Sequence, residues 1–324
     1  MKHLNTSALR KTVTVFLVAA LVFSCKVGPN PDKQYETLDG KNTYKLELNP
    51  EPGSVYHYDI VNETGTKVET GEKKLKSLNN TEAGITYTIS KDSSGNLVLK
   101  MVFDKIHVYS KSGDKEKDID ADRSAFSTDP QEKMLGALKG TTLETIMNAS
   151  GETSSISGFK ELGDKIMAGY SNADIGMKNI LQARLEQLVG DRMIKNSITQ
   201  LFKIFPDSAV HTGDKWKINA DQAGEFNLHI RSFFQLKEVH DDISVIASQG
   251  DISSDSTMIN VEGLGQVLSN LHGKQEGEYK METKTGMLLE ARITAKVEGN
   301  IQFMGRQMPV IMKVSVKIDG KKMN

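Results

Sequence analysis

The chain has 324 residues, of which 38% are hydrophobic and 26% charged, and its 41 basic and 42 acidic side chains leave a net charge of -1. This balance is ordinary for a globular protein and lacks the basic excess that marks a nucleic-acid-binding protein. Cys25 is the only cysteine, which excludes an internal disulfide and a cysteine-based metal site.

Residues 1–24 carry the signature of an exported protein. A basic start precedes an uncharged apolar run at residues 12–23. That run has the length of a secretory h-region and is shorter than the about 20 residues that cross a bilayer. Residues 22–25, which end in Ser24-Cys25, resemble a lipobox, although Phe23 is larger than the usual residue there. The alternative is a plain signal peptide with an incidental cysteine.

We predict that residues 1–24 are a signal peptide and that Cys25 is the lipidation site. Two or more acyl chains anchor a protein stably, whereas one chain binds a membrane only marginally. Residues 25–42 contain glycines and prolines in place of a helical or strand pattern, so we predict an extended tether. Lys26, where inner-membrane retention favours Asp, indicates the outer membrane. The predicted location is the cell envelope, lipid-anchored in the outer membrane and facing the periplasm.

Strand patterns dominate the chain after this tether. The clearest lies at residues 55–61, where Tyr56, Tyr58 and Ile60 share the face that we predict to be buried. Further strands are predicted at residues 44–48, 85–90, 97–109, 141–147 and 153–156, and a short helix at residues 129–138. Turns between them are predicted at Gly65, Gly71, and residues 93–96, 112–114 and 150–151.

The hydrophobic period becomes helical between residues 159 and 205. Its apolar stripe contains Met177, Leu181, Leu185, Leu188, Ile194, Ile198, Leu201 and Phe202. We predict a helical insert at about 159–205 that covers the concave side or one open end of the sheet. The stripe is most simply core. The alternatives are that some of its side chains line a cavity between helices and sheet, or that the insert is a separate subdomain.

Strand patterns resume after the insert, without the strand–helix alternation of a parallel sheet. They lie at residues 215–218, 227–236, 243–249, 256–261, 278–282, 288–297 and 310–318, with turns at 285–286, 299–300 and 305–306. We therefore predict a β-rich α+β fold, in which an antiparallel curled sheet or half-barrel carries the helical insert at about 159–205. Residues 43–324 then form a single β-rich domain.

No motif for catalysis or cofactor binding rises above background in this sequence. Residues 238–242 contain possible metal ligands, but a polar hairpin turn explains them better. Gly263-Leu264-Gly265 is interpreted as a bulge or turn. The segment from His211 to Trp216 predicts a tight turn followed by a buried tryptophan, with a tryptophan at a pocket mouth as the alternative. We predict no catalytic, cofactor-binding or metal-binding residue, no cofactor and no enzyme activity.

Short motifs spread over most of the chain point to one family. They are the lipobox at Cys25, Gly53-Ser54-Val55-Tyr56-His57-Tyr58, Phe205-Pro206-Asp207, His211-Thr212-Gly213-Asp214-Lys215-Trp216 and Thr285-Gly286-Met287-Leu288-Leu289. With these motifs the chain resembles a family of uncharacterised exported lipoproteins common in Bacteroidota. The family has no established activity, so the resemblance implies no catalytic residue. The order of elements is also similar to lipoprotein carriers, which hold acyl chains in an unclosed barrel.

These observations predict an envelope lipoprotein that binds an apolar or lipid ligand in its curled sheet. The alternative is a non-enzymatic structural or interaction module that docks another envelope protein. The predicted partners are a membrane, through the lipid anchor at Cys25, together with an apolar ligand or an envelope protein. No nucleic acid is expected.

Overall fold

The computed structural model describes residues 43–71, 73–168, 175–176, 202–222, 228–255, 258–261 and 265–323. The predicted signal peptide, Cys25 and the predicted tether lie outside the described residues. So do residues 177–201, which hold most of the predicted helical stripe, and residues 263–264.

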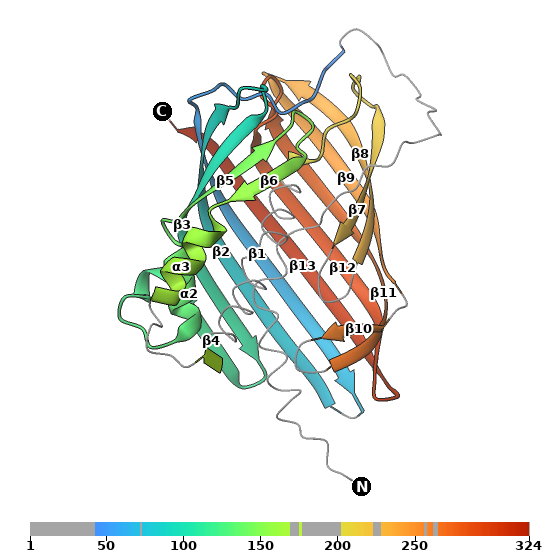
Figure 1. Cartoon of the computed structure of the whole chain (residues 1–324). Helices are drawn as coiled ribbons and strands as arrows, with labels where there is room; N and C mark the ends of the chain where they lie inside the picture. The colour runs from blue at the N-terminus through green and yellow to red at the C-terminus, as the bar shows by residue number, and fades with distance from the viewer. Residues whose placement is uncertain are drawn as a thin grey trace.

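Antiparallel strands form one continuous sheet over the described residues, in the order β6-β5-β3-β2-β1-β13-β12-β11-β9-β8-β7, with β4 paired to β3 and β10 to β11 (Figure 1). Their bounds are β1 Val55–Thr70, β2 Lys73–Lys91, β3 Leu97–Ser112, β4 Lys115–Asp120, β5 Thr142–Met147, β6 Thr153–Ser157, β7 Lys215–Gln222, β8 Leu228–His240, β9 Ile243–Ser254, β10 Met258–Val261, β11 Gly265–Glu282, β12 Leu288–Phe303 and β13 Arg306–Met323.

The first and last strands pair with each other in the middle of this sheet. β1 lies between β2 and β13, and its register runs from Val55 opposite Met323 to Val68 opposite Val310. Every long central strand therefore has a partner on both sides, so its backbone groups are satisfied within the sheet. The two halves of the chain are joined into one β-structure by this pairing.

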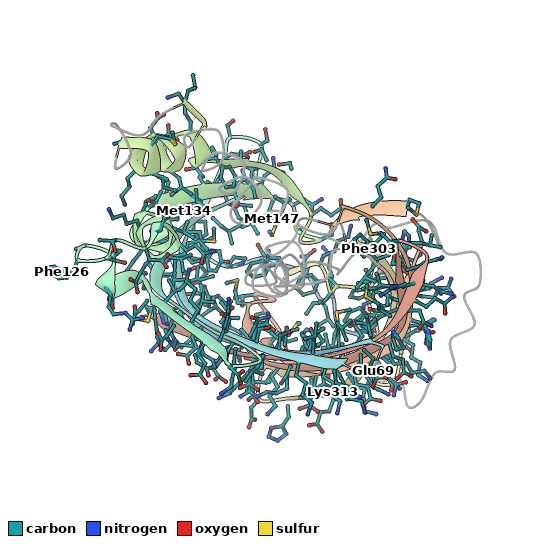
Figure 2. The ribbon with its side chains drawn as sticks, turned by 90° about the horizontal axis from the view of Figure 1, so that it is seen from below. Glu69, Phe126, Met134, Met147, Phe303 and Lys313 are labelled. Atoms are coloured by element: carbon teal, nitrogen blue, oxygen red, sulfur yellow. The ribbon has the colours of Figure 1, made fainter. Side chains whose placement is uncertain are left out.

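The sheet is strongly curved, and its two faces differ in character. Figure 2 shows Lys313 on the outside of the curve and Met147 on the inside. Tyr56, Tyr58 and Ile60 are buried, as the period-two pattern predicts, whereas alternate residues on the same strand are more exposed. The predicted fold class, a curled antiparallel sheet with a small helical part, is confirmed.

Two helices lie beside β3 at one side of the sheet (Figure 1). The helix α2 (Pro130–Leu138) begins after Asp129, whose side chain accepts hydrogen bonds from the backbone N–H groups of Gln131 and Glu132. This confirms the predicted short helix. The helix α3 (Phe159–Ala168) begins where the helical insert was predicted to begin. No helix among the described residues has the length and apolarity needed to cross a membrane.

Three predicted local features are wrong. Gly65 lies inside β1, because pairing with β2 and β13 on both sides holds it in the strand. Gly299 lies inside β12, where a Cβ atom would come within 2.1 Å of the carbonyl oxygen of Asn270. A close strand approach, and no turn, requires this glycine. Residues 44–48 form no strand: only Tyr44 makes an isolated bridge, with Val210, and Leu48 N–H donates to the Ala149 carbonyl.

Other predicted turns occur where the sequence placed them. Asp241 and Asp242, inside the predicted polar turn, both have positive φ angles, of 50° and 64°. They join β8 to β9 as a two-residue hairpin turn. Gly71, Gly95, Gly113, Gly151, Gly286 and Gly305 also have positive φ angles at turn positions.

Candidate functional site

One part of the concave face is a core closed by several kinds of element. Beside strand residues such as Tyr58 and Leu99, it contains Leu138 of α2, Ile166 of α3 and Phe202. Tyr87 makes edge contacts with Tyr58 and Phe202, with ring centroids 5.6 and 5.9 Å apart. We call this buried set the enclosed core.

Trp216 anchors one end of the enclosed core. Its indole N–H donates to the Ile204 carbonyl at 2.9 Å, and its ring stacks on Phe234 with centroids 5.9 Å apart. Asp214 forms the tight turn before it by accepting the backbone N–H of His211 at 2.8 Å. The predicted turn and buried tryptophan are both confirmed, and the Trp216 side chain lies in the core rather than at a pocket mouth.

A second buried apolar cluster lies on the same face of the sheet. All of its members belong to β8, β9, β11, β12 and β13: they are Leu228, Ile230, Ile252, Val267, Leu271, Ala295, Val297, Ile301, Met308, Val310 and Met312. No described helix or loop contributes to it. We call this cluster of buried side chains on the inner side of the curve the apolar wall.

A polar surface meets the apolar wall at the junction of β1 and β13. Thr66 lies opposite Met312 in the register, and Thr64 lies opposite Val314, which packs against the apolar wall. The same polar surface continues across β2 and β3, where Asn79 lies opposite both Thr64 and Ser110. The polar wall, as we name it, consists of Thr64, Thr66, Ser77, Asn79 and Ser110, all buried and all uncharged.

Buried polar groups also occur further across the sheet, in the line of paired residues that runs from Thr64 on β1 to Ser232 on β8. Gln275 lies opposite Gly250, which lies opposite Ser232. Because Gly250 has no side chain, the Gln275 amide reaches across it and donates to Ser232 Oγ at 2.8 Å. A Cβ atom at Gly250 would come within 2.8 Å of Gln275 Cγ. The glycine thus makes room for a hydrogen bond between β11 and β8, strands that are not neighbours.

The buried tyrosines of the enclosed core are held in the neutral form. Burial raises the pKa of Tyr87 and raises the pKa of Tyr58 well above its ordinary value, with a smaller contribution to the latter from neighbouring Tyr87. The Tyr87 hydroxyl is fully buried and has no hydrogen-bond partner. These groups are therefore set up to remain protonated, and neither is poised for acid–base chemistry near neutral pH.

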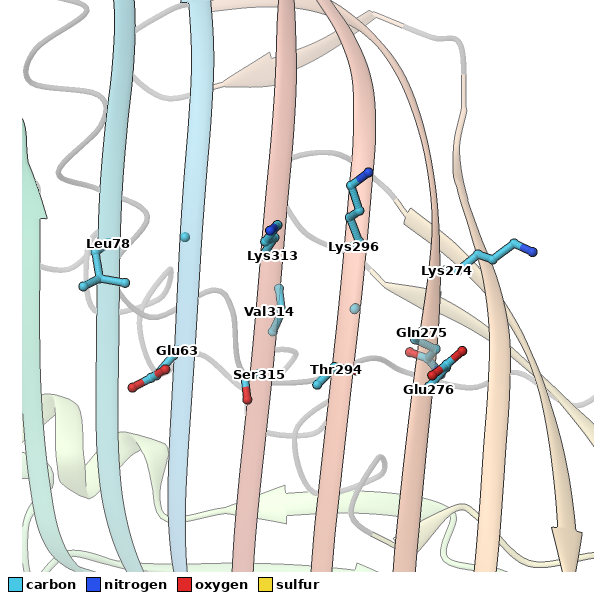
Figure 3. Close-up of a pocket in the computed structure, with 12 residues that line it drawn as sticks. Glu63, Leu78, Lys274, Gln275, Glu276, Thr294, Lys296, Lys313, Val314 and Ser315 are labelled. Atoms are coloured by element: carbon cyan, nitrogen blue, oxygen red, sulfur yellow. The ribbon is translucent and has the colours of Figure 1, made fainter.

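The outer face carries a row of three lysines on adjacent strands. Lys274 on β11 lies opposite Lys296 on β12, and Lys296 lies opposite Lys313 on β13. Figure 3 shows the three side chains in one row, with Glu63, Ser315, Thr294 and Glu276 in the next. Like charges directly opposite each other are destabilising in a sheet. We call this set the lysine row.

A shallow groove of about 490 Å³ runs along the lysine row. Gly65 lies opposite Lys313 and supplies no side chain there, which leaves space between Lys313 and the exposed Leu78 on β2. Lys296 forms an ion pair with Glu298 at 2.6 Å, and that contact lowers the pKa of the glutamate. Glu63 and Glu276 line the groove as well, so it is the lysine row alone, and not the whole groove, that can accept an anionic group.

His57 belongs to a polar network on the outer face that superficially resembles a catalytic triad. Its Nδ1 lies 3.0 Å from Thr86 Oγ1, and its Nε2 lies 3.5 Å from Asp59 Oδ1. The Thr86 hydroxyl, however, donates to Asp104 at 2.5 Å, so its proton points to a carboxylate and not to the imidazole. The arrangement ties β1, β2 and β3 together and does not present an activated nucleophile.

The described residues contain no group of three or more His, Cys, Asp or Glu side chains that could hold a metal ion. At the predicted polar turn His240 pairs with Asp241 at 2.9 Å, in full solvent contact. The sequence did not reveal the polar wall, because the predicted strand stopped at Val61 before Gly65. An available signal was the alternation that Thr64 and Thr66 continue from Tyr56 and Tyr58.

A curled antiparallel sheet whose inner face carries two buried apolar clusters, the enclosed core and the apolar wall, is thus the architecture of this chain. The chain belongs to DUF6263, a family of unknown function, which matches residues 94–288, more than half of its length. No curated protein matches it.

Two solved structures are similar to this chain over most of its length. The translocator domain of the autotransporter NalP from Neisseria meningitidis is 8% identical, with 84% of this chain and 90% of that chain covered and a TM-score of 0.33. An outer membrane channel from Pseudomonas putida F1 is 7% identical, with 88% and 100% covered and a TM-score of 0.26.

Proposed function

We propose that this protein is a non-enzymatic lipoprotein of the cell envelope that binds an apolar or lipid ligand on the inner face of its curled sheet. The apolar wall carries this proposal. Its side chains are 0–8% exposed and, among the described residues, come from strands alone, whereas the enclosed core on the same face is completed by helices and other segments. Apolar surfaces of this kind, with a few converging polar groups, are the usual setting of a ligand site.

Binding can be tested by titrating the mature chain, with Cys25→Ser to prevent lipidation, with an environment-sensitive apolar dye in detergent-free buffer. We expect saturable binding and its reversal by long-chain lipids but not by short-chain analogues. The reason is that each buried methylene contributes about 0.8 kcal/mol to transfer from water. A dye signal that no lipid displaces would contradict the proposal.

The proposed location in the envelope rests on Cys25 and on the family resemblance of the sequence. Three acyl chains on Cys25 would hold the protein stably at the outer membrane, facing the periplasm. Expression of the full chain with a labelled fatty acid should give a labelled, membrane-bound protein. The Cys25→Ser variant should be unlabelled and released in soluble form. Label on the variant would place the acylation elsewhere.

A second function, docking of another envelope protein, is favoured by the lysine row. Three lysines side by side on a solvent-exposed sheet face complement an acidic segment of a partner, at the cost of repulsion in the free protein. Binding of a fluorescent acidic peptide should weaken as salt rises. It should be lost when Lys274, Lys296 and Lys313 are changed to Gln, while dye binding on the inner face is unchanged. Peptide binding that is unaffected by salt and by the three substitutions would rule out this role for the lysine row.

A further inference from the structure

The polar wall contains neighbouring side chains whose hydrogen-bonding atoms have no partner. Thr64 Oγ1, Thr66 Oγ1 and Asn79 Nδ2 are buried and make no hydrogen bond. The three residues are 5%, 6% and 4% exposed. Buried polar groups in native proteins are nearly always satisfied, and each exception needs an explanation. Three such unpartnered groups on the adjacent strands β1 and β2 indicate that a hydrogen-bonding molecule belongs against this part of the inner face.

The position of these groups relates them to the apolar wall. Thr64 and Thr66 lie on β1 directly opposite Val314 and Met312 of β13, so the polar and apolar walls adjoin within one strand spacing. Asn79 lies opposite Thr64 on the other side. A molecule with an aliphatic chain on the apolar wall would therefore bring a polar end or linkage against Thr64, Thr66 and Asn79.

The chemistry of the polar wall specifies what that end can be. An amide N–H of Asn79 donates, and the threonine hydroxyls both donate and accept. No member of either wall carries a charge. An ionised carboxylate or phosphate seated there would lose its hydration without a compensating cation, which is strongly unfavourable. An ester carbonyl or a hydroxyl can use the available donors and acceptors without that penalty.

We propose, resting on the ligand-binding function above, that the inner face selects lipids with an uncharged hydrogen-bonding group, of the acylglycerol class. The ester and hydroxyl groups of the lipid bond to Thr64, Thr66 and Asn79. The acyl chain lies along the apolar wall formed by β8, β9, β11, β12 and β13.

The test compares a monoacylglycerol with the fatty acid of the same chain length at pH 8, where the acid is ionised. Both are titrated as displacers of the apolar dye from the mature Cys25→Ser chain. We expect the monoacylglycerol to bind at least tenfold more tightly. Equal affinities, or tighter binding of the fatty acid, would overturn the selection of an uncharged group while leaving lipid binding itself in place. Failure of both lipids to displace the dye would instead count against the proposed function.

Variants locate the selectivity. Thr64→Val combined with Thr66→Val keeps shape and removes two hydroxyls, and it should weaken monoacylglycerol binding about tenfold without changing fatty acid binding. The unfolding midpoint of the ligand-free protein should stay the same or rise, because unpartnered hydroxyls are replaced by methyl groups. A purely structural role would lower it.

The matched control is Thr145→Val. Thr145 is also buried with an unpartnered hydroxyl, but it lies on β5 between Leu143 and Met147 of the enclosed core. Its substitution should leave both lipid affinities unchanged. The single variant Thr66→Val serves if the double variant does not fold. Unchanged monoacylglycerol affinity in the folded polar-wall variants would overturn the proposal.

Discussion

The enclosed core and the apolar wall lie on the same face of one sheet and are built from the same kinds of side chain, yet they differ in what completes them. Helix residues such as Leu138 and Ile166, and Phe202, contribute to the enclosed core. Strands alone contribute to the apolar wall within the described part of the chain. Burial therefore does not by itself distinguish packing from a ligand surface. Whether the neighbouring side chains come from helices and loops or from strands alone distinguishes the two regions better.

The largest expected difference concerns cavities. Leu99 in the enclosed core and Leu271 in the apolar wall are both fully buried. Leu99→Ala should lower the free energy of unfolding by about 3 kcal/mol, because a close-packed site cannot collapse around the missing atoms. Leu271→Ala in ligand-free protein should cost about 2 kcal/mol, the lower end for a buried leucine, because among the described residues only strands pack around it. Urea unfolding measures both values, and equal losses would make the apolar wall an ordinary core.

The next effect concerns binding. Val310 belongs to the apolar wall, and its neighbour Ile311 points to the outer face of the same strand. Val310→Asp should weaken dye binding at least tenfold, since an unpaired carboxylate is unfavourable beside an aliphatic surface. Ile311→Asp is the matched control and should leave dye affinity unchanged. Similar losses in both variants would show that the dye does not bind at the inner face.

Alkaline pH should act on the enclosed core. Burial raises the pKa of Tyr87 in the folded protein, so above about pH 10 the unfolded chain releases a proton that the folded chain keeps. Unfolding therefore becomes more favourable as pH rises, by up to about 1.4 kcal/mol per pH unit for each such tyrosine. Tyr87→Phe should reduce this slope and leave stability at pH 7 the same or higher. Unfolding curves between pH 8 and 11 test it, and an unchanged slope would contradict the assignment.

The smallest effect belongs to the outer face. Lys313 lies opposite Lys296, whereas Lys280 lies opposite Glu290 at 3.3 Å. Lys313→Thr should stabilise the protein by a few tenths of a kcal/mol at low salt, and Lys280→Thr should not. The difference in stability between the two variants should vanish in 1 M salt, where the screening length is about 3 Å. Destabilisation by Lys313→Thr at low salt would mean that the lysine has an attractive partner.

The sequence predicts this fold well wherever a local pattern decides the outcome. The alternation at Tyr56, Tyr58 and Ile60 identifies the buried face, and Pro130 after Asp129 identifies a helix start. Glycine gives a wrong turn prediction where contacts between strands determine the local structure. Gly65 and Gly299 look like turns, but the first is held by pairing on both sides and the second by a close strand approach.

The candidate site is less accessible from sequence than the fold. The lysine row exists only through the register of β11, β12 and β13. The position of Thr66 opposite Met312 depends on the pairing of β1 with β13, which lie far apart in the chain. Register depends on the turns and on the whole sheet, which no local pattern contains. Six residues of the apolar wall lie within predicted strands, whereas Ile252, Val267, Leu271, Ile301 and Met308 lie beyond the predicted strand ends. The separation of the apolar wall from the enclosed core follows from which other elements pack beside each.

The central claim is that the inner face holds a lipid, and native mass spectrometry of the mature Cys25→Ser chain tests it most directly. The protein is produced in bacteria with export to the cell envelope, purified without detergent and sprayed intact. We predict a population with one added mass in the lipid range, which is lost on collisional activation and is reduced in the Val310→Asp variant. A clean mass of the protein alone, in every preparation and after incubation with monoacylglycerol, would contradict the claim.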